Sequence, residues 1–274
     1  MRNHASGRGS ASVAALFALL LVILTFSTIY FFAARTWWFP ESVSPLGQSI
    51  DQQFTRTLWI TGLVFLLSQL GLAFALVRYR DRGGRAHYSH GNNTLEALWT
   101  AATLILFVGL GIAAENAWVT YHAQAAAPNA LVVEITGQQF QWNFRYPGPD
   151  GQFGRIAPEY INDGAGNFVG LDPNDPAAKD DLVVPTMAVP VNREVVVLLK
   201  AKDVTHSFFV RELRFKQDTV PGLVIRMHFM ATKVGEYEVT CAELCGLGHH
   251  RMRTVLKVLE PAEYERWLVK EAAP

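Results

Sequence analysis

The chain has 274 residues, half of them hydrophobic, and equal numbers of basic and acidic side chains. The balance hides two unlike parts, because residues 1–115 carry eight arginines and five acidic residues, whereas residues 116–274 carry sixteen basic and nineteen acidic residues. The first part is typical of a membrane segment and the second of a mildly acidic globular domain. Such a domain suits a basic protein partner and argues against nucleic acid, which binds basic patches.

Three uncharged apolar runs in the first part predict membrane-spanning helices: residues 9–34, 57–77 and 97–114. Each is close to the ~20 residues that cross a bilayer as a helix. The first run has a rival interpretation as a signal peptide, with Arg2 and Arg8 as its charged start and Phe32-Ala-Ala34 as the cleavage site. We favour a retained helix, because its apolar length exceeds the ~7–15 residues usual in signal peptides.

The arginines predict the orientation of these helices. The loop of residues 78–85 holds four arginines, so it is expected to stay in the cytoplasm under the positive-inside rule. Arg2 and Arg8 place the N-terminus on the same side. Three crossings then put everything after residue 115 outside the cytoplasm.

Strand patterns replace helical ones from about residue 124. Residues 130–136, 194–200, 235–240 and 254–259 are rich in β-branched side chains and are separated by turn residues. This pattern predicts an all-β sandwich or barrel. Residues 147–181, rich in Pro, Gly, Asp and Asn, are expected to form a long surface excursion that is functional or faces a partner. Residues 260–268 suggest a short C-terminal helix.

The only two cysteines, Cys241 and Cys245, are followed closely by His249 and Met252, and His206 lies 35 residues before the first of them. Thiolates, imidazoles and a thioether favour copper over magnesium or calcium. A disulfide is the simplest alternative outside the cytoplasm, but it would need none of the other three residues. A zinc site would leave Met252 unused, and a single blue-copper centre uses one thiolate. A dinuclear copper centre employs every ligand.

The motif Cys-x-Glu-x-Cys-Gly-x-x-His-x-x-Met, preceded by Asp-Val-x-His-Ser, resembles subunit II of haem–copper cytochrome c oxidases. The resemblance covers nearly all of the chain from about residue 57. It implies a cupredoxin β-sandwich that holds the dinuclear copper centre called CuA, in which both cysteines bridge the two coppers. The implied ligands are His206, Cys241, Cys245, His249, Met252 and the carbonyl of Glu243. The family pattern also implies that the Glu243 side chain reaches a magnesium ion at the interface with subunit I.

The membrane part is similar to the same family. Glu96-Ala-Leu-Trp99-Thr, at the cytoplasmic start of the third run, is similar to the family's Glu-x-x-Trp-Thr. In related oxidases this glutamate stands at the entrance of a proton path into subunit I, which makes Glu96 a candidate. A carboxylate at a helix N-terminus also has a plain explanation in the helix dipole.

Two departures from the family pattern concern the electron donor and the partners. Members often read Gly-His-Gln-Trp-Tyr-Trp, and the first Trp takes the electron from cytochrome c, but here that position is Phe140 and the last aromatic is Trp142. Both are candidates for electron acceptance. The alternation of aromatic residues at positions 140–146 also fits ordinary packing on one face of a strand. The other departure is the extra N-terminal helix, which could dock a partner complex.

The expected protein is therefore an α+β membrane protein, with N-terminal transmembrane helices followed by a cupredoxin-like sandwich. Its expected domains are an extra helix (1–36), a helical hairpin (37–123), the CuA domain (124–260) and a C-terminal helix or tail (261–274). The resemblance implies a bacterial inner-membrane oxidase whose C-terminal domain is periplasmic. Subunit II would take electrons from a cytochrome c or another c-type haem donor, which could belong to a supercomplex. It would pass them to haem in subunit I, where oxygen reduction is coupled to proton translocation.

Two rival functions belong to other classes. One is a copper- or zinc-binding membrane module that is not part of an oxidase. The other is a subunit of a quinol-oxidising or nitrous-oxide-reducing complex. A quinol oxidase would be expected to lack the copper ligands, and the three-helix anchor with the Glu96 motif is the wrong setting for a nitrous oxide reductase.

Overall fold

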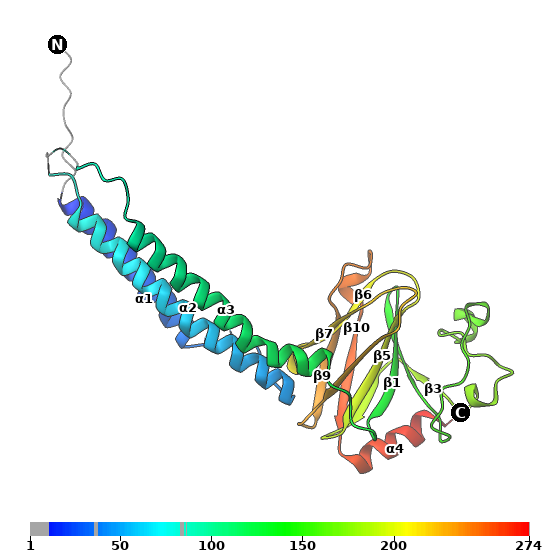
Figure 1. The fold of residues 1–274 in the computed structure, drawn as a ribbon. Helices are drawn as coiled ribbons and strands as arrows, with labels where there is room; N and C mark the ends of the chain where they lie inside the picture. Colours follow the sequence, from blue (N-terminus) through cyan, green and yellow to red (C-terminus); the bar gives the residue numbers. More distant parts are fainter. Residues whose placement is uncertain (1–10, 36–37, 83–84, 86, 274) are drawn as a thin grey trace. The chain divides into compact units, whose positions relative to one another are not determined.

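The computed structural model describes residues 11–35, 38–82, 85 and 87–273 (Figure 1). Arg2 and Arg8, used above for orientation, lie outside these residues. The chain divides into two compact units, one containing residues up to Phe39 together with Gln52–Ala114, the other Pro40–Asp51 together with the chain from Glu115 onward. Each unit is described by itself.

The membrane unit contains α1 (Ala11–Ala33) and most of the long helices α2 (Pro45–Arg78) and α3 (Asn93–His122). Among the described residues, three helical segments are long and apolar enough to cross a membrane: Ala11–Ala33, Pro45–Arg78 and Asn93–Glu115. Hydroxyl groups inside them are satisfied locally. Thr25 and Thr28, for example, donate hydrogen bonds to the carbonyls of Leu21 and Leu24, and such internal pairing is what hydrocarbon requires of a spanning segment.

The second unit is a sandwich of two five-stranded sheets (Figure 1). One sheet has the order β3-β2-β1-β5-β8 and the other β4-β10-β9-β6-β7. The strands are β1 (Leu131–Gln138), β2 (Gln141–Tyr146), β3 (Leu182–Val184), β4 (Met187–Pro190), β5 (Glu194–Ala201), β6 (His206–Val210), β7 (Phe215–Thr219), β8 (Ile225–Met230), β9 (Gly235–Cys241) and β10 (Arg253–Leu259). Helix α4 (Pro261–Glu271) follows the last strand. The predicted fold class, apolar helices followed by an all-β sandwich, is confirmed.

The core lies between the two sheets and is filled by alternate side chains of each strand. On β2, Trp142, Phe144 and Tyr146 are all buried, as the period of two predicts. The hydroxyl of Tyr146 joins the two sheets, because it donates to the carbonyl of Ala188 on β4 and accepts from the same residue's N–H, each at 2.8 Å.

The excursion of residues 147–181 is attached to β2 through the side chain of Arg145. It contains three short 3₁₀ helices, Pro158–Tyr160, Asp163–Ala165 and Pro176–Ala178. The guanidinium of Arg145 anchors it, donating to the carbonyl of Gly154 and to Asp181 while also pairing with Glu134 on β1 at 2.8 Å. An arginine that points away from the core is therefore buried beneath the excursion.

Residues 40–51, between α1 and most of α2, are tied to the sandwich. The N–H of Val43 donates to the carbonyl of Glu212, and the N–H of Thr232 donates to the carbonyl of Val43. Arg214 pairs with Asp51 through two hydrogen bonds of 2.9 and 2.8 Å. The first turns of α2 consequently belong to the globular unit.

Candidate metal centre

The predicted copper ligands lie at one end of the sheet that contains β6, β9 and β10. His206 is the first residue of β6 and Cys241 the last residue of β9. The loop of residues 242–252 joins β9 to β10, and it is closed by a hydrogen bond from the N–H of Cys241 to the carbonyl of Met252. The N–H of Ala242 donates to the carbonyl of Ser207, which fastens the loop to β6. Sheet register thus brings the remote histidine to the cysteine loop.

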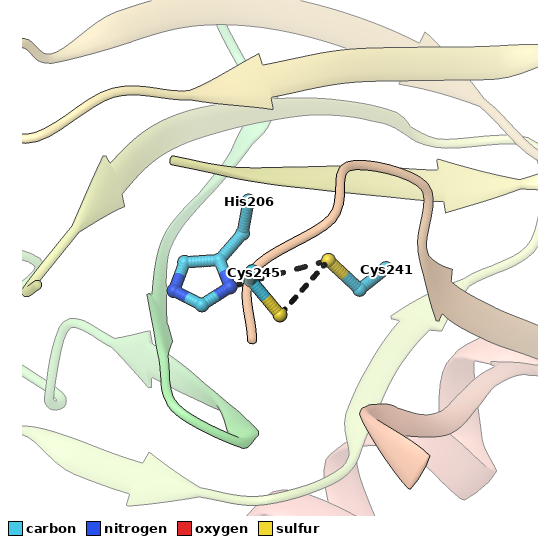
Figure 2. Close-up of side chains that lie close together, drawn as sticks. All are labelled: His206, Cys241 and Cys245. Carbon is cyan, nitrogen blue, oxygen red and sulfur yellow. Dashed lines mark hydrogen bonds between the residues drawn. The ribbon is translucent and has the colours of Figure 1, made fainter. Parts of the chain in front are cut away.

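Figure 2 shows the buried centre of this arrangement, with the ring of His206 beside the two cysteine sulfurs. One ligand atom from each of His206, Cys241 and Cys245 lies within 4.8 Å of the others. The Sγ atoms of Cys241 and Cys245 are 3.9 Å apart, and both cysteines are free thiols. A disulfide, which has sulfurs ~2.05 Å apart, is therefore absent from this pair.

Each thiol has its own imidazole. Nδ1 of His206 is 4.0 Å from Sγ of Cys241, and Nδ1 of His249 is 3.7 Å from Sγ of Cys245. The Glu243 carbonyl lies 3.2 Å from Sγ of Cys241, and the thioether of Met252, which is buried, lies 3.7 Å from Sγ of Cys245. The other four predicted ligand groups therefore lie close to the two cysteine sulfurs.

These spacings fit a metal centre. Two ligands that each bind one metal at roughly 2.3 Å in tetrahedral geometry lie about 3.8 Å apart, which is close to the separations of 3.7–4.0 Å between the sulfurs and their neighbours. The donor set consists of three sulfurs, two imidazole nitrogens and one carbonyl oxygen, so the residues are compatible with copper. Burial and the neighbouring Cys241 raise the pKa of the Cys245 thiol to about 11. The metal-free thiol therefore holds its proton at neutral pH, and metal binding would release it.

Asp203 and Gln139, which the sequence motifs did not identify as site residues, hold the ligands in place. Asp203 accepts a hydrogen bond of 2.8 Å from Nε2 of His206 and one of 2.7 Å from the N–H of Gln139. The side-chain amide of Gln139 donates to the carbonyl of Cys245 at 2.6 Å. Partial burial would raise the pKa of Asp203, but hydrogen bonds from Gln139, His206 and Val204 outweigh it and hold the pKa below its ordinary value. The spacing of three between Asp203 and His206 was the only sequence signal for this support.

The two aromatic candidates both lie close to the centre, Trp142 beside His206 and Phe140 against the loop. Trp142 is buried, and its ring centroid is 6.0 Å from that of His206. Phe140 is 38% exposed, and its ring lies over the loop, where a side chain added at Gly248 would meet it at 2.4 Å. Leu247, in the same loop, is 96% exposed. The metal loop therefore carries apolar groups on its outer surface.

The two candidate glutamates, Glu243 and Glu96, lie in different parts of the chain. The side chain of Glu243 is exposed, while its carbonyl faces Cys241. Glu96 is in the first turn of α3. The side chain of Asn92 accepts from the N–H groups of Thr94 and Leu95 there, so Glu96 is not needed as the helix cap.

Comparison with known proteins agrees with the geometry. Residues 131–259 match the family described as cytochrome c oxidase subunit II, periplasmic domain. The alternative cytochrome c oxidase subunit 2 of Bradyrhizobium diazoefficiens is 36% identical over 265 residues, which cover 93% of this chain and 91% of the relative. The cytochrome c oxidase subunit 2 of Cereibacter sphaeroides is 28% identical over 240 residues, covering 84% and 78%.

Among solved structures, the chain is similar to the periplasmic domain of subunit II of cytochrome oxidase from Bradyrhizobium japonicum. That match has 27% identity and a TM-score of 0.39, and it covers 54% of this chain and 95% of that one.

The fold, the donor set and the length of the match to the Bradyrhizobium diazoefficiens relative define the class: this chain belongs to the cytochrome c oxidase subunit 2 family. It is a membrane protein and a component of a haem–copper oxidase. The resemblance predicted from the sequence and the class of enzyme are both confirmed.

Proposed function

We propose that this subunit accepts electrons from a cytochrome c-type donor through a dinuclear copper centre and delivers them to haem in subunit I. The proposed ligands are the side chains of His206, Cys241, Cys245, His249 and Met252 with the carbonyl of Glu243. The observation that carries the proposal is the convergence of two free thiols, each with its own imidazole 3.7–4.0 Å away, on one buried point. One zinc ion could use the two thiols and two imidazoles, but it would leave unused the Met252 thioether and the Glu243 carbonyl, which lie 3.7 and 3.2 Å from the sulfurs.

When bound by the two thiolates and their neighbouring ligands, the copper pair would supply a site that takes up and releases one electron with little rearrangement. The chain's own residues prepare this site. Asp203 accepts a hydrogen bond from the Nε2–H group of His206. The proton therefore stays on Nε2, and Nδ1 keeps its lone pair on the side of Cys241. Gln139 holds the loop by its bond to the carbonyl of Cys245. Burial of both cysteines and of Met252 excludes water from the ligands.

The donor is proposed to dock over the metal loop, where Phe140 and Leu247 are exposed. Exposed apolar side chains over a redox centre suit brief contact with another protein, and the acidic globular part of the chain would steer in a basic donor. Phe140 lies against the loop glycines, and Trp142 lies beside His206. We propose that these two aromatic residues accept the electron. The donor could belong to a supercomplex.

The remaining roles concern the partner subunits. The exposed Glu243 carboxylate is proposed to bind magnesium at the interface with subunit I. Glu96 is proposed to stand at the entrance of a proton path, because Glu96-Ala-Leu-Trp99-Thr is similar to the family's Glu-x-x-Trp-Thr and ionisable groups of spanning segments are functional candidates. Oxygen reduction and the proton translocation coupled to it belong to subunit I. The proposed location is the bacterial inner membrane, with the sandwich on the periplasmic side, because four arginines lie at residues 78–85.

Cys245→Ser in the intact oxidase tests the proposal. We expect loss of one or both coppers by elemental analysis, loss of the near-infrared absorption of the copper pair, and loss of electron transfer from the donor. Full retention of copper and absorption would refute the assignment. His249→Ala and His250→Ala form a matched pair, because His249 faces Cys245 whereas His250 is exposed. We expect the first to lose copper and the second to keep it.

Metal content also distinguishes the proposed function from that of a copper- or zinc-binding module that is not part of an oxidase. A zinc- or copper-binding module outside an oxidase would be purified without haem subunits, and with zinc or a single copper per chain. The proposal requires two coppers and no zinc per chain, together with subunit I.

A further inference from the structure

The function proposed above gives no role to a groove in the membrane unit. It lies between the last turns of α1 and the first half of the apolar part of α2 (the blue-to-cyan helices in Figure 1). Its volume is about 570 Å³, within the range of ~300–1,000 Å³ that is usual for small-molecule sites. The lining residues are mostly apolar: Thr28, Ile29, Phe32, Ala33, Arg35, Trp38, Thr55, Leu58, Trp59, Thr61, Gly62, Leu63, Phe65 and Leu66.

The length of the groove along α2 matches the thickness of one leaflet of a bilayer. Along α2 the lining runs from Thr55 to Leu66, which at 1.5 Å per residue is roughly 16 Å. The hydrocarbon core of a bilayer is about 30 Å thick, so the groove extends to about its middle. A neighbouring transmembrane helix crosses both leaflets and would need a groove of twice this length. An acyl chain of one leaflet has the right length.

Charge at the end of the groove indicates the headgroup. Among the described residues that line the groove, Arg35 alone is ionisable, and its guanidinium lies 5.4 Å from the ring centroid of Trp38. Trp59, also in the lining, is 69% exposed. Tryptophan and arginine at the end of a spanning helix lie at the level of lipid headgroups. A guanidinium binds phosphate through two parallel hydrogen bonds.

We propose that this groove is a binding site for one anionic glycerophospholipid of the leaflet opposite the loop of residues 78–85. One acyl chain fills the space between α1 and α2, and the phosphate pairs with Arg35. The lipid would then fasten the first helix, whose residues mostly remain exposed along its length, to the second.

The test uses the intact oxidase complex, delipidated in detergent and titrated with phosphatidylglycerol or with phosphatidylcholine of the same acyl chains. Native mass spectrometry counts the lipid bound to this subunit. Arg35→Gln removes the charge, and Gly62→Phe fills the groove. A Cβ at Gly62 would meet nothing within 4 Å, and the same holds for Gly71, which is outside the groove. Gly71→Phe and Arg56→Gln, a cation on α2 outside the lining, are therefore the matched controls.

We expect one phosphatidylglycerol to be retained by the unaltered protein in preference to phosphatidylcholine. Arg35→Gln should weaken phosphatidylglycerol binding at least about tenfold, since it removes a charged hydrogen bond. Gly62→Phe should abolish binding of either lipid, and both controls should bind as the unaltered protein does. Three results would overturn the proposal: no retained lipid, equal retention of both lipids, or retention of phosphatidylglycerol by Gly62→Phe. A copurified quinone in its place would do the same.

Discussion

Asp203→Asn is the change that most directly probes how the chain holds its metal ligands. The carboxylate accepts from Nε2 of His206 and from the N–H of Gln139 through different oxygens, at 2.8 and 2.7 Å. An asparagine of the same shape has one oxygen and one NH₂ group. Whichever way the amide is turned, one of the two donors therefore faces another donor.

The magnitude follows from burial. A buried donor left without its acceptor costs about 1–3 kcal/mol. His206 is fully buried, but the side chain of Asp203 is 31% exposed, so water would replace part of the loss and the lower half of that range applies. About 1.4 kcal/mol corresponds to a tenfold change in affinity, in the range of 10–100-fold found when partners of metal-bound histidines are removed.

The assay is competition for copper between the protein and a chelator of known affinity. We expect Asp203→Asn to bind copper about tenfold more weakly, with unchanged stoichiometry. Asp218→Asn is the control, because Asp218 is on the neighbouring strand β7 and outside the ligand set. Equal copper affinity for Asp203→Asn and the unaltered protein would show that the carboxylate does not orient His206, and would refute this reasoning.

Two further predictions concern the sandwich itself. Arg145→Met should lower the free energy of unfolding by about 3 kcal/mol, because it leaves the buried Asp181 without its cation while Glu134 keeps Lys200; chemical denaturation measures this, and a loss under 1 kcal/mol would contradict it. Tyr146→Phe should cost about 2 kcal/mol, because both backbone groups of Ala188 lose their partner. An unchanged melting temperature in Tyr146→Phe would mean that water replaces the hydroxyl.

Hydropathy located the spanning helices but not their ends. The second apolar run begins at residue 57, whereas α2 begins at Pro45. Residues 48–53 are mostly polar, so they give no hydropathy signal, yet the backbone hydrogen bonds of a helix continue regardless of side-chain polarity. The attachment of residues 40–51 to the sandwich could not be predicted either, because it depends on pairs such as Arg214 with Asp51, 163 residues apart.

The excursion shows the same limit. Its Pro, Gly, Asp and Asn content predicted a surface segment, and composition of this kind does not reveal what orders it. In the structure, Asn167 bonds to the backbone of Tyr160 and Leu171, and Arg145 holds both ends. Side chains that bond to backbone atoms define such a segment, and those bonds appear only once the chain is folded.

The loop glycines show how the site could be predicted in part. Four of the five ligand side chains lie within 12 residues of sequence, so their spacing is informative by itself. Gly246 and Gly248 lie between Cys245 and His249, and from the sequence both are explained as residues that permit a tight loop. That explanation holds for Gly246, which has φ of +133°, a conformation that other residues rarely adopt. Gly248 has φ of −90° and could carry a side chain as far as its backbone is concerned. What excludes one is the ring of Phe140, 2.4 Å from where a Cβ would lie. The residue that departs from the family pattern therefore packs directly on the metal loop, and a glycine beneath it lets the aromatic ring approach so closely.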